Sequence, residues 1–486
     1  MILLPDTPTT PLSPAALRRW ILLFVISLGF MARMATFQVP LFDHHSWRQA
    51  DGATIARNFY REGLTPLRPT IDGRGDSAEG TVATGLELHS LLFAAVSRLT
   101  GFSDMVGRVV SALCFPASAL LLWVFCRSRY GEDYALIATF VYSLGLPLVV
   151  YAERSVWNEP VLILLSMAAL ASAELYGVQP RPLRLLALVV SLSLLGAVKP
   201  QWLIMLAPVW ALWFERHGWK FLARWETWLV VVFPCATAGG FLWHMHEVAQ
   251  RTQLTFGAAD KLFQFGDMTG HFVFVITRRM VRDIFGPVGV VALVVGLITL
   301  VRRGRRVELA AVFGCLVYLI AVSHGNRRHD YYQLALVPAG VMTIPAGILA
   351  IAHWARQRLP EAWTVPRVVV TLLWMMLLSC FIRSVSFHSW YEVDQDKLRF
   401  CEALRPQLAA GELLVFADYN SPDVMYCLDR RGWFYQGPPM TVEQVREMRD
   451  KGADVLVMPM SSAGALAGTG TPIARTNDWL AVRLAN

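Results

Sequence analysis

The hydrophobic positions of this chain fall into long apolar runs separated by short polar segments and one long polar stretch. A helix needs about twenty apolar residues to cross a hydrocarbon core of ~30 Å, and somewhat fewer where its neighbours bury it. The pattern therefore predicts an α-helical polytopic membrane protein with about eleven transmembrane helices. We expect these helices over residues 20–38, 107–126, 134–151, 159–177, 183–198, 201–215, 226–246, 285–301, 307–323, 332–353 and 366–386.

One further apolar stretch, residues 86–100, differs from these runs. It is short, carries Glu87, His89 and Arg98, and ends at a glycine. Its apolar positions repeat at helical spacing. We therefore expect an interfacial helix on the membrane surface, inside a long polar loop over residues 39–106.

Basic residues fall on alternate sides of the predicted helices. Arg18 and Arg19 precede the first helix, and the run from Arg302 to Arg306 separates two later ones. Cytoplasmic loops of membrane proteins carry an excess of Lys and Arg. This orientation predicts an integral protein of a bacterial plasma (inner) membrane, with the loop 39–106 and the C-terminal region extracytoplasmic.

Composition supports this class and argues against nucleic acid. Hydrophobic residues make up 55% of the chain, charged residues 16%, and the mean hydropathy is +0.44. Soluble domains carry roughly a quarter charged residues. The net charge of +8 is explained by basic clusters between apolar runs, so no nucleic-acid partner is expected.

After about residue 389 the composition becomes that of a small soluble domain. Residues 413–417 and 455–458 predict buried strands, and residues 441–451 a helix that begins at a threonine. We therefore divide the chain into a transmembrane domain, 1–388, and a small α/β domain, 389–486, on the outer face. Cys401 and Cys427 lie in the second domain, where an oxidising compartment would allow them to pair.

The most informative polar segment follows the first predicted helix and reads Asp43-His44-His45-Ser46-Trp47-Arg48-Gln49-Ala50-Asp51. A carboxylate at the membrane surface can take a proton from an acceptor hydroxyl or amine. Asp43 is therefore our candidate general base. The structural alternative is that Asp43 caps a helix that begins near Ser46.

The two histidines of this segment are candidate site residues, but sequence gives them no standard metal spacing. Because His44 and His45 are adjacent, they should diverge on a regular helix or strand. Asp43 with one histidine and a distant carboxylate is a conceivable cation site. We assign no metal ligand and expect no cofactor. A divalent metal is the alternative.

Basic side chains predicted at the same membrane level suggest a phosphate-binding site. Lys199 lies at the outer end of an apolar helix, where a lysine is costly unless it is paired or functional. Charge-assisted hydrogen bonds to phosphate oxygens would explain it, and snorkelling to the interface is the alternative. The loops predicted at that level add Arg154, Arg327, Arg328, Tyr331 and Tyr332.

Three further carboxylates are candidates. Glu159 opens a predicted helix before Pro160, which is typical of an ordinary helix start as well as of a catalytic acid. Glu79 and Glu87, both in the loop 39–106, have weaker individual claims.

Taken together, these segments resemble the GT-C glycosyltransferases that use polyprenyl-phosphate sugars, family 39 in particular. That family includes protein O-mannosyltransferases and lipid A aminoarabinose transferases. The resemblance covers about residues 18–386. It is carried by the Asp43–Asp51 segment with residues 55–60 after it, by residues 151–160, by Lys199-Pro200, and by His329-Asp330-Tyr331-Tyr332 leading to Pro338.

The resemblance implies a role for several residues. Asp43 matches the family's first acidic residue, a general base, and Glu159 is most similar to its second acidic position. The basic residues implied to hold the lipid phosphate are Lys199 and either Arg154 or Arg327. Our further candidates for binding the phosphate or the rest of the substrate are Arg328, Arg48, Arg57, His329, Tyr331 and Tyr332. Two departures are the sequence around Glu87, which lacks the family's usual prolines, and His44, which stands where relatives have a second acid.

The implied reaction is direct inversion. A sugar on an undecaprenyl-phosphate-like lipid would pass to an acceptor glycan, lipid or protein at the outer face of the membrane. Two alternative functions remain. One is a transporter or flippase for lipid-linked sugars, which would need internal repeats and polar residues near the membrane midplane. The other is an oligosaccharide ligase or polymerase with a diphosphate-linked donor.

Overall fold

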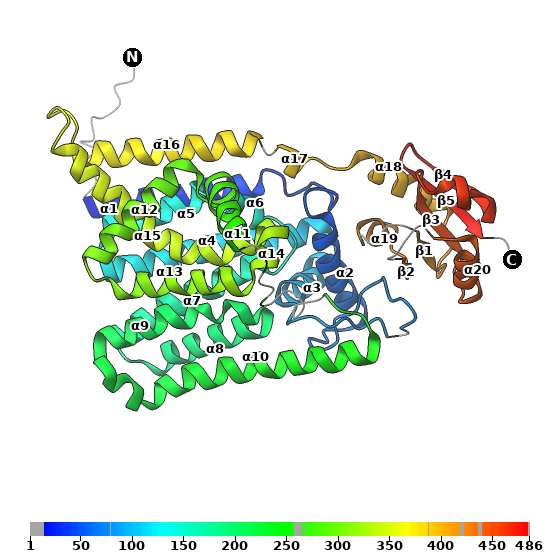
Figure 1. Cartoon of the computed structure of the whole chain (residues 1–486), viewed down its shortest axis with the longest axis horizontal. Helices are drawn as coiled ribbons and strands as arrows, with labels where there is room; N and C mark the ends of the chain where they lie inside the picture. Colours follow the sequence, from blue (N-terminus) through cyan, green and yellow to red (C-terminus); the bar gives the residue numbers. More distant parts are fainter. Residues whose placement is uncertain are drawn as a thin grey trace, which may run out of the picture.

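The computed structural model describes residues 14–484, apart from residues 78, 257–262, 264–265, 267, 387, 418–421 and 436–439. Helices dominate the first 386 residues, and a small sheet follows them (Figure 1).

The helices of the first part follow the apolar runs closely. Their bounds are α1 Pro14–Met34, α2 Ser46–Glu62, α3 Leu88–Thr100, α4 Asp104–Tyr130, α5 Glu132–Leu144, α6 Pro147–Ala152, α7 Glu159–Val178, α8 Pro182–Val198, α9 Leu206–His217, α10 Trp225–Thr252, α11 Met268–Phe274, α12 Gly286–Arg302, α13 Arg306–Ala321, α14 Ser323–Arg328, α15 Val337–Arg356 and α16 Val365–Ser386. Shorter segments join them: 3-10 turns over Pro200–Met205, Gly218–Ala223 and Asp330–Leu336, and a π-helix over Val275–Ile284.

Six described helices are long and apolar enough to cross a membrane: α1, α4, α7, α10, α16, and α15 with the 3-10 turn before it. The segment Met268–Ile284 and α12 are bent by 117° relative to each other. Counted together as one broken helix, they give a seventh span. The protein is therefore an integral membrane protein. Each of the eleven predicted spans contains helix, but the count of eleven stays a prediction because several of these helices are short.

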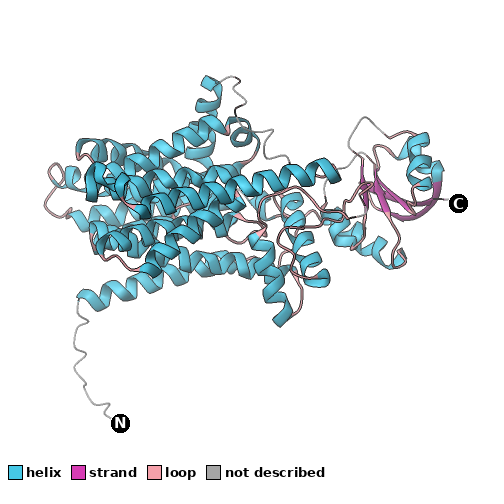
Figure 2. Ribbon diagram, turned by 90° about the horizontal axis from the view of Figure 1, so that it is seen from below, coloured by secondary structure: helices cyan, strands magenta, loops and turns pink. Residues whose placement is uncertain are grey.

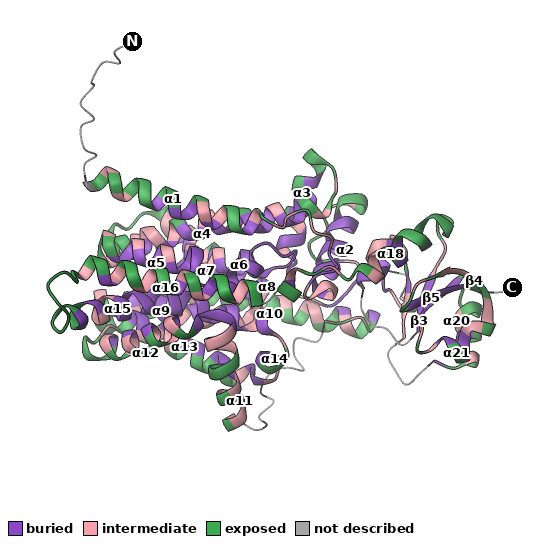
Figure 3. Cartoon of the chain, turned by 90° about the horizontal axis from the view of Figure 1, so that it is seen from above, coloured by how far each residue is buried: buried purple, intermediate pink, exposed green. Residues whose placement is uncertain are grey.

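Close approach of two backbones holds α12 against α15. A Cβ atom on Gly347 would lie 1.8 Å from the carbonyl oxygen of Ala292, and one on Gly296 would lie 2.3 Å from that of Thr343. Small residues at such crossings let membrane helices pack closely. The buried residues concentrate on α4, α6 and α7 inside the bundle, whereas α1 and α10 expose much of their outer surface (Figure 3).

Charges inside the bundle are paired. The Arg33 guanidinium lies 2.6 Å from the Glu153 carboxylate, and neither side chain has exposed surface. Tyr142 donates a hydrogen bond to the same carboxylate. An unpaired charge in hydrocarbon costs several kcal/mol, so the two charges stabilise the bundle only as a pair. The pair joins α1 to the segment after α6.

The C-terminal region forms a five-stranded sheet in the order β2-β1-β3-β5-β4, beyond one end of the helical bundle (Figure 2). Its strands are β1 Leu414–Phe416, β2 Gly432–Phe434, β3 Val455–Pro459, β4 Gly470–Arg475 and β5 Trp479–Leu484, and its helices are α17 His388–Tyr391, α18 Gln395–Leu404, α19 Asp423–Leu428, α20 Val442–Asp450 and α21 Ala463–Leu466. Strands β1, β2 and β3 are parallel, and the pairs of β5 are antiparallel.

The predicted small α/β unit is confirmed. Strands β1 and β3 lie where expected, and Thr441 caps α20 through a capping box with Gln444. The proposed domain boundary falls within α17. Cys401 and Cys427 are free thiols in the structure.

Helices α2 and α3 fill the space between the bundle and the sheet (Figure 1). Several contacts fasten α19 and the residue after it to α2 and to the start of α4. Ser46 donates a hydrogen bond of 2.6 Å to Asp423, Tyr426 donates one of 2.6 Å to Asp104, and Arg61 forms a two-bond ion pair with Asp429. The C-terminal region therefore packs directly on the loop that carries the candidate site.

Candidate active site

Asp43, the predicted base, lies just before α2 and is enclosed. Its side chain has no exposed surface. One carboxylate oxygen accepts a hydrogen bond of 2.6 Å from Gln49, and the other accepts from Arg108 at 3.2 Å and from Arg154. These bonds join α2, α4 and the segment between α6 and α7.

Asp43 does not cap α2. His45 is the N-cap residue of the helix, its side chain makes no capping hydrogen bond, and the Asp43 carboxylate accepts from the side chain of Gln49 instead. The capping interpretation of Asp43 is therefore wrong, and the arginine contacts take its place.

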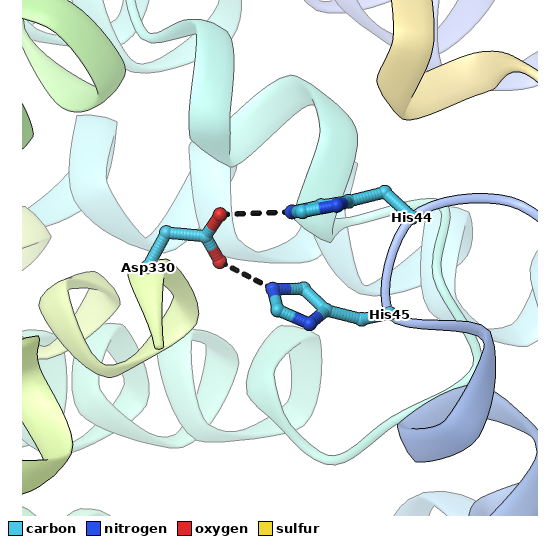
Figure 4. Close-up of side chains that lie close together, drawn as sticks. All are labelled: His44, His45 and Asp330. Carbon is cyan, nitrogen blue, oxygen red and sulfur yellow. Dashed lines mark hydrogen bonds and ion pairs between the residues drawn. The ribbon is translucent and has the colours of Figure 1, made fainter. Parts of the chain in front are cut away.

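The expectation that the two histidines diverge is also wrong. His45 adopts a left-handed backbone conformation, with φ 55° and ψ 35°, and this turns the chain so that both rings point to one carboxylate. The Nε2 atoms of His44 and His45 lie 2.9 Å and 2.7 Å from the two oxygens of Asp330 (Figure 4). Asp330 opens the 3-10 turn before α15, so this contact links the first loop to a distant part of the bundle.

Arg48 is the centre of a second group of charges. It lies one turn into α2, 3.5 Å from the Glu87 carboxylate. Burial alone would lower the pKa of the guanidinium, but Glu87 and Glu159 outweigh it and raise the pKa. Arg48 is therefore positively charged in a site that is mostly shielded from water.

Glu87 is held by more than Arg48. Its carboxylate accepts hydrogen bonds from Asn158 at 2.9 Å and from Thr84 at 3.0 Å. Glu87 precedes α3, which spans Leu88–Thr100 as the sequence predicted. The sequence around Glu87 lacks the prolines that are usual in the family, but the Glu87 carboxylate still lies in the site.

Asp51 lies on the same helix as Arg48 and was not among the predicted site residues. It is 8% exposed. Burial raises the pKa of its carboxyl to about 7; Arg48 opposes this shift, and Glu87 and Asp423 add to it. Within the described part of the chain, no hydrogen bond or ion pair engages this carboxyl, so its oxygens remain available.

Lys199 pairs with Glu159. The ammonium lies against the Glu159 carboxylate and 5.4 Å from the ring centroids of both Tyr331 and Tyr332. Lys199 ends α8, and backbone hydrogen bonding of Leu86 to Ala197 brings the segment before α3 to the same place. A Cβ atom on Gly85 would lie 2.2 Å from the Val198 carbonyl oxygen, so only glycine permits this approach.

Aromatic rings separate these groups. His329 stacks on Tyr331, with centroids 5.3 Å apart, and contacts Trp47. Trp390 of α17 stacks on His44, with centroids 5.0 Å apart and planes at 6°. Helix α17, which follows α16, thus contributes a ring to the candidate site.

Four predicted residues lie apart from this group. Arg57 pairs with Asp72 and Asp429, which fastens the C-terminal region, and Glu79 forms an exposed ion pair with Arg251. Arg327 and Arg328 are exposed at the end of α14.

Sequence reasoning missed Arg108, Gln49, Asp330 and Asp51 as members of the site. Arg108 had a usable signal, because an arginine inside an apolar run is costly without a partner. Asp330 and Asp51 belonged to segments already singled out, but only the fold reveals what they face.

The whole chain was compared with known proteins. No protein-family model and no curated protein matches its sequence. Among solved structures, ArnT from Cupriavidus metallidurans bound to undecaprenyl phosphate superposes with a TM-score of 0.70, at 14% identity, over 97% of this chain and 98% of that one. Its apo state gives a TM-score of 0.69 at 13% identity, over 96% of this chain and 98% of that one.

An archaeal structure extends the likeness. The Archaeoglobus fulgidus oligosaccharyltransferase tethered to an acceptor peptide matches with a TM-score of 0.57, at 10% identity, over 91% of this chain and 69% of that one. The chain has the GT-C fold. The GT-C fold accounts for the helical bundle, and the match to ArnT continues through the C-terminal sheet because it covers nearly the whole chain.

Proposed function

We propose that the protein is an inverting glycosyltransferase that moves a sugar from a polyprenyl-phosphate donor to an acceptor glycan, lipid or protein. The observation that carries this proposal is the near-complete superposition on ArnT bound to undecaprenyl phosphate. A bacterial inner membrane, with the site on its outer face, fits the distribution of basic residues. No nucleotide-sugar loop is required for such a donor.

The cations of the site support a phosphate-bearing substrate. Lys199 and Arg48 lie on adjoining segments, and each pairs with a carboxylate, Glu159 or Glu87. A donor phosphate would exchange with one of these carboxylates, which keeps the charge balanced. The sugar would then lie beside α2, and the polyprenyl chain would run between helices.

The transfer itself needs positioning and charge stabilisation more than covalent catalysis. The acceptor oxygen or nitrogen forms a bond to the anomeric carbon from the side opposite the phosphate. The bond between that carbon and the phosphate oxygen breaks, and polyprenyl phosphate leaves with the electron pair. The acceptor proton passes to a carboxylate of the protein.

Two carboxylates are candidates for that base. Asp43 is the residue implied by the family resemblance, but Gln49 and two arginines occupy its oxygens. Asp51 supports a second assignment, because it has free oxygens and a pKa of about 7, near the value that suits a general base. We propose that one of the two accepts the proton. If that residue is Asp51, Asp43 holds the start of α2 in place through Gln49, Arg108 and Arg154.

The experiment for this proposal is donor binding by native mass spectrometry in detergent. The probes are undecaprenyl phosphate and undecaprenyl diphosphate at equal concentration. We expect the monophosphate to bind the wild type and to bind Lys199→Ala at least about tenfold more weakly. The exposed variant Lys451→Ala is the matched control, with unchanged binding.

The rivals give other outcomes. Preference for the diphosphate would favour a ligase or polymerase. A flippase would bind the monophosphate sugar but would leave the sugar–phosphate bond intact in a parallel turnover assay. Equal monophosphate binding by wild type and Lys199→Ala would remove Lys199 from the phosphate site.

A further inference from the structure

The most unusual side-chain cluster outside the lysine–glutamate pair is formed by His44, His45 and Asp330. Two consecutive histidines place their Nε2 atoms 2.9 Å and 2.7 Å from separate oxygens of one carboxylate. Their ring centroids are 3.9 Å apart. Figure 4 shows both rings directed at the carboxylate from the same side.

Convergence of adjacent side chains requires a special backbone. His45 has φ 55°, and non-glycine residues with positive φ are uncommon because the Cβ atom crowds the backbone. Such a conformation costs of order 1 kcal/mol or more and persists where the surroundings enforce it. Helix capping does not explain it here, since the His45 side chain makes no capping hydrogen bond.

The donor set is that of a divalent metal site. One ligand atom from each of the three residues lies within 4.8 Å of the other two. Two imidazoles and one carboxylate are the protein ligands of many sites that bind Zn²⁺ and keep a fourth position open. Imidazole nitrogens favour Zn²⁺ and its neighbours in the first transition row over Mg²⁺ and Ca²⁺.

The surroundings leave access for an ion. The side chain of His44 is 27% exposed, whereas those of His45 and Asp330 are 11% and 6% exposed. The competing cation is Arg279, whose Nη1 atom lies 3.9 Å from Asp330 but 3.0 Å from Asp283. Arg279 therefore has its closer partner elsewhere, and the Asp330 carboxylate faces the two histidines.

We propose that His44, His45 and Asp330 bind one divalent transition-metal cation of the Zn²⁺ class, with an open position for water or a phosphate oxygen. The site joins the first polar loop to the turn before α15. It replaces the conceivable site built on Asp43, whose oxygens are occupied by Arg108, Arg154 and Gln49. Metal binding at this place does not depend on the proposed transferase activity.

The test is a titration of the full-length protein in detergent, stripped with a chelator and then given Zn²⁺. All variants carry Cys427→Ser, so that the Cys401–Cys427 thiols do not contribute a second site. We expect one equivalent of Zn²⁺ by calorimetry and by elemental analysis. His45→Gln and Asp330→Asn should each weaken binding at least about tenfold, since loss of a ligand costs more than the roughly tenfold loss typical of an outer-shell partner.

His388→Gln is the matched control, because His388 is an exposed histidine that pairs with Glu392 outside the cluster. Circular dichroism checks that each variant folds. If Asp330→Asn does not fold, substitution with Co²⁺ gives an independent answer in the wild-type cluster, since its visible absorption reports the geometry and the nitrogen and oxygen ligands. Absence of Zn²⁺ binding, or equal binding by the wild-type cluster and His45→Gln, would overturn the proposal.

Discussion

The acidic residues at the start of α2 illustrate how burial separates side chains that look equivalent in the sequence. Asp43 and Asp51 are eight residues apart in one polar segment. Three donors surround the carboxylate of Asp43, whereas the carboxyl of Asp51 is buried near Arg48, Glu87 and Asp423. Asp43 was predictable as a site residue. Asp51 was not, because its raised pKa comes first from burial, to which the distant Glu87 and Asp423 add.

Replacing Asp51 by Asn should stabilise the protein at alkaline pH. Burial raises the carboxyl pKa from 3.8 to about 7, so the folded state binds this proton more tightly than the unfolded chain between those values. Folding stability from this group is therefore lost as the pH rises through about 7. The melting temperature of Asp51→Asn should exceed that of the wild type at about pH 8 and approach it below about pH 4; a lower value at pH 8 would contradict the raised pKa.

Replacing Asp43 by Asn should have the opposite effect. Asn keeps the shape but leaves Arg108 and Arg154, which are at most 1% exposed, without a counter-charge. Removing one partner of a buried ion pair costs about 3 kcal/mol or more. Denaturant unfolding would measure the loss against the exposed control Asp478→Asn, and equal stability of the two variants would contradict it.

At the scale of elements, the long helices were predictable and the short ones were not. Apolar runs such as residues 107–126 marked α4, whereas the bend between the π-helix and α12 left no periodic signal. The left-handed residue before α2 was equally hidden, because histidine carries no strong preference that announces it. The convergence of His44 and His45 therefore required the structure.

The docking of α19 on α4 gives a prediction at this scale. Tyr426 donates a hydrogen bond to Asp104, and Arg57 packs over its ring. Tyr426→Phe keeps the ring and removes the hydroxyl, so we expect the C-terminal region to loosen by about 1 kcal/mol, the net contribution of a typical hydrogen bond. Limited proteolysis between residues 387 and 422 should become faster.

The control for that variant is Tyr435→Phe, which removes a hydroxyl that accepts a hydrogen bond from Gln444 within the C-terminal unit. It should not change the proteolysis of the connecting segment. Equal rates for Tyr426→Phe and the wild type would show that the hydroxyl does not hold the two parts together.

At the scale of the molecule, the sequence predicted a membrane-embedded helical bundle with a small α/β unit, and the structure confirms both. The likeness to ArnT at 14% identity explains why sequence comparison is silent while the fold is plain. Helix packing tolerates wide exchange of apolar residues, whereas the arrangement of the helices is retained. The proposed donor therefore rests on this structural likeness, and the paired cations and carboxylates of the site support it.

The central claim is that this site breaks the bond between a sugar and polyprenyl phosphate. In the most direct measurement, purified protein is incubated with labelled undecaprenyl-phosphate hexoses and pentoses. A membrane extract supplies the acceptors, and the undecaprenyl phosphate released is quantified. We predict release with at least one donor, strongly reduced in Lys199→Ala and in one of Asp43→Asn and Asp51→Asn, all normalised to folded protein. Donors that stay intact throughout, or release that is unchanged in all three variants, would contradict the account.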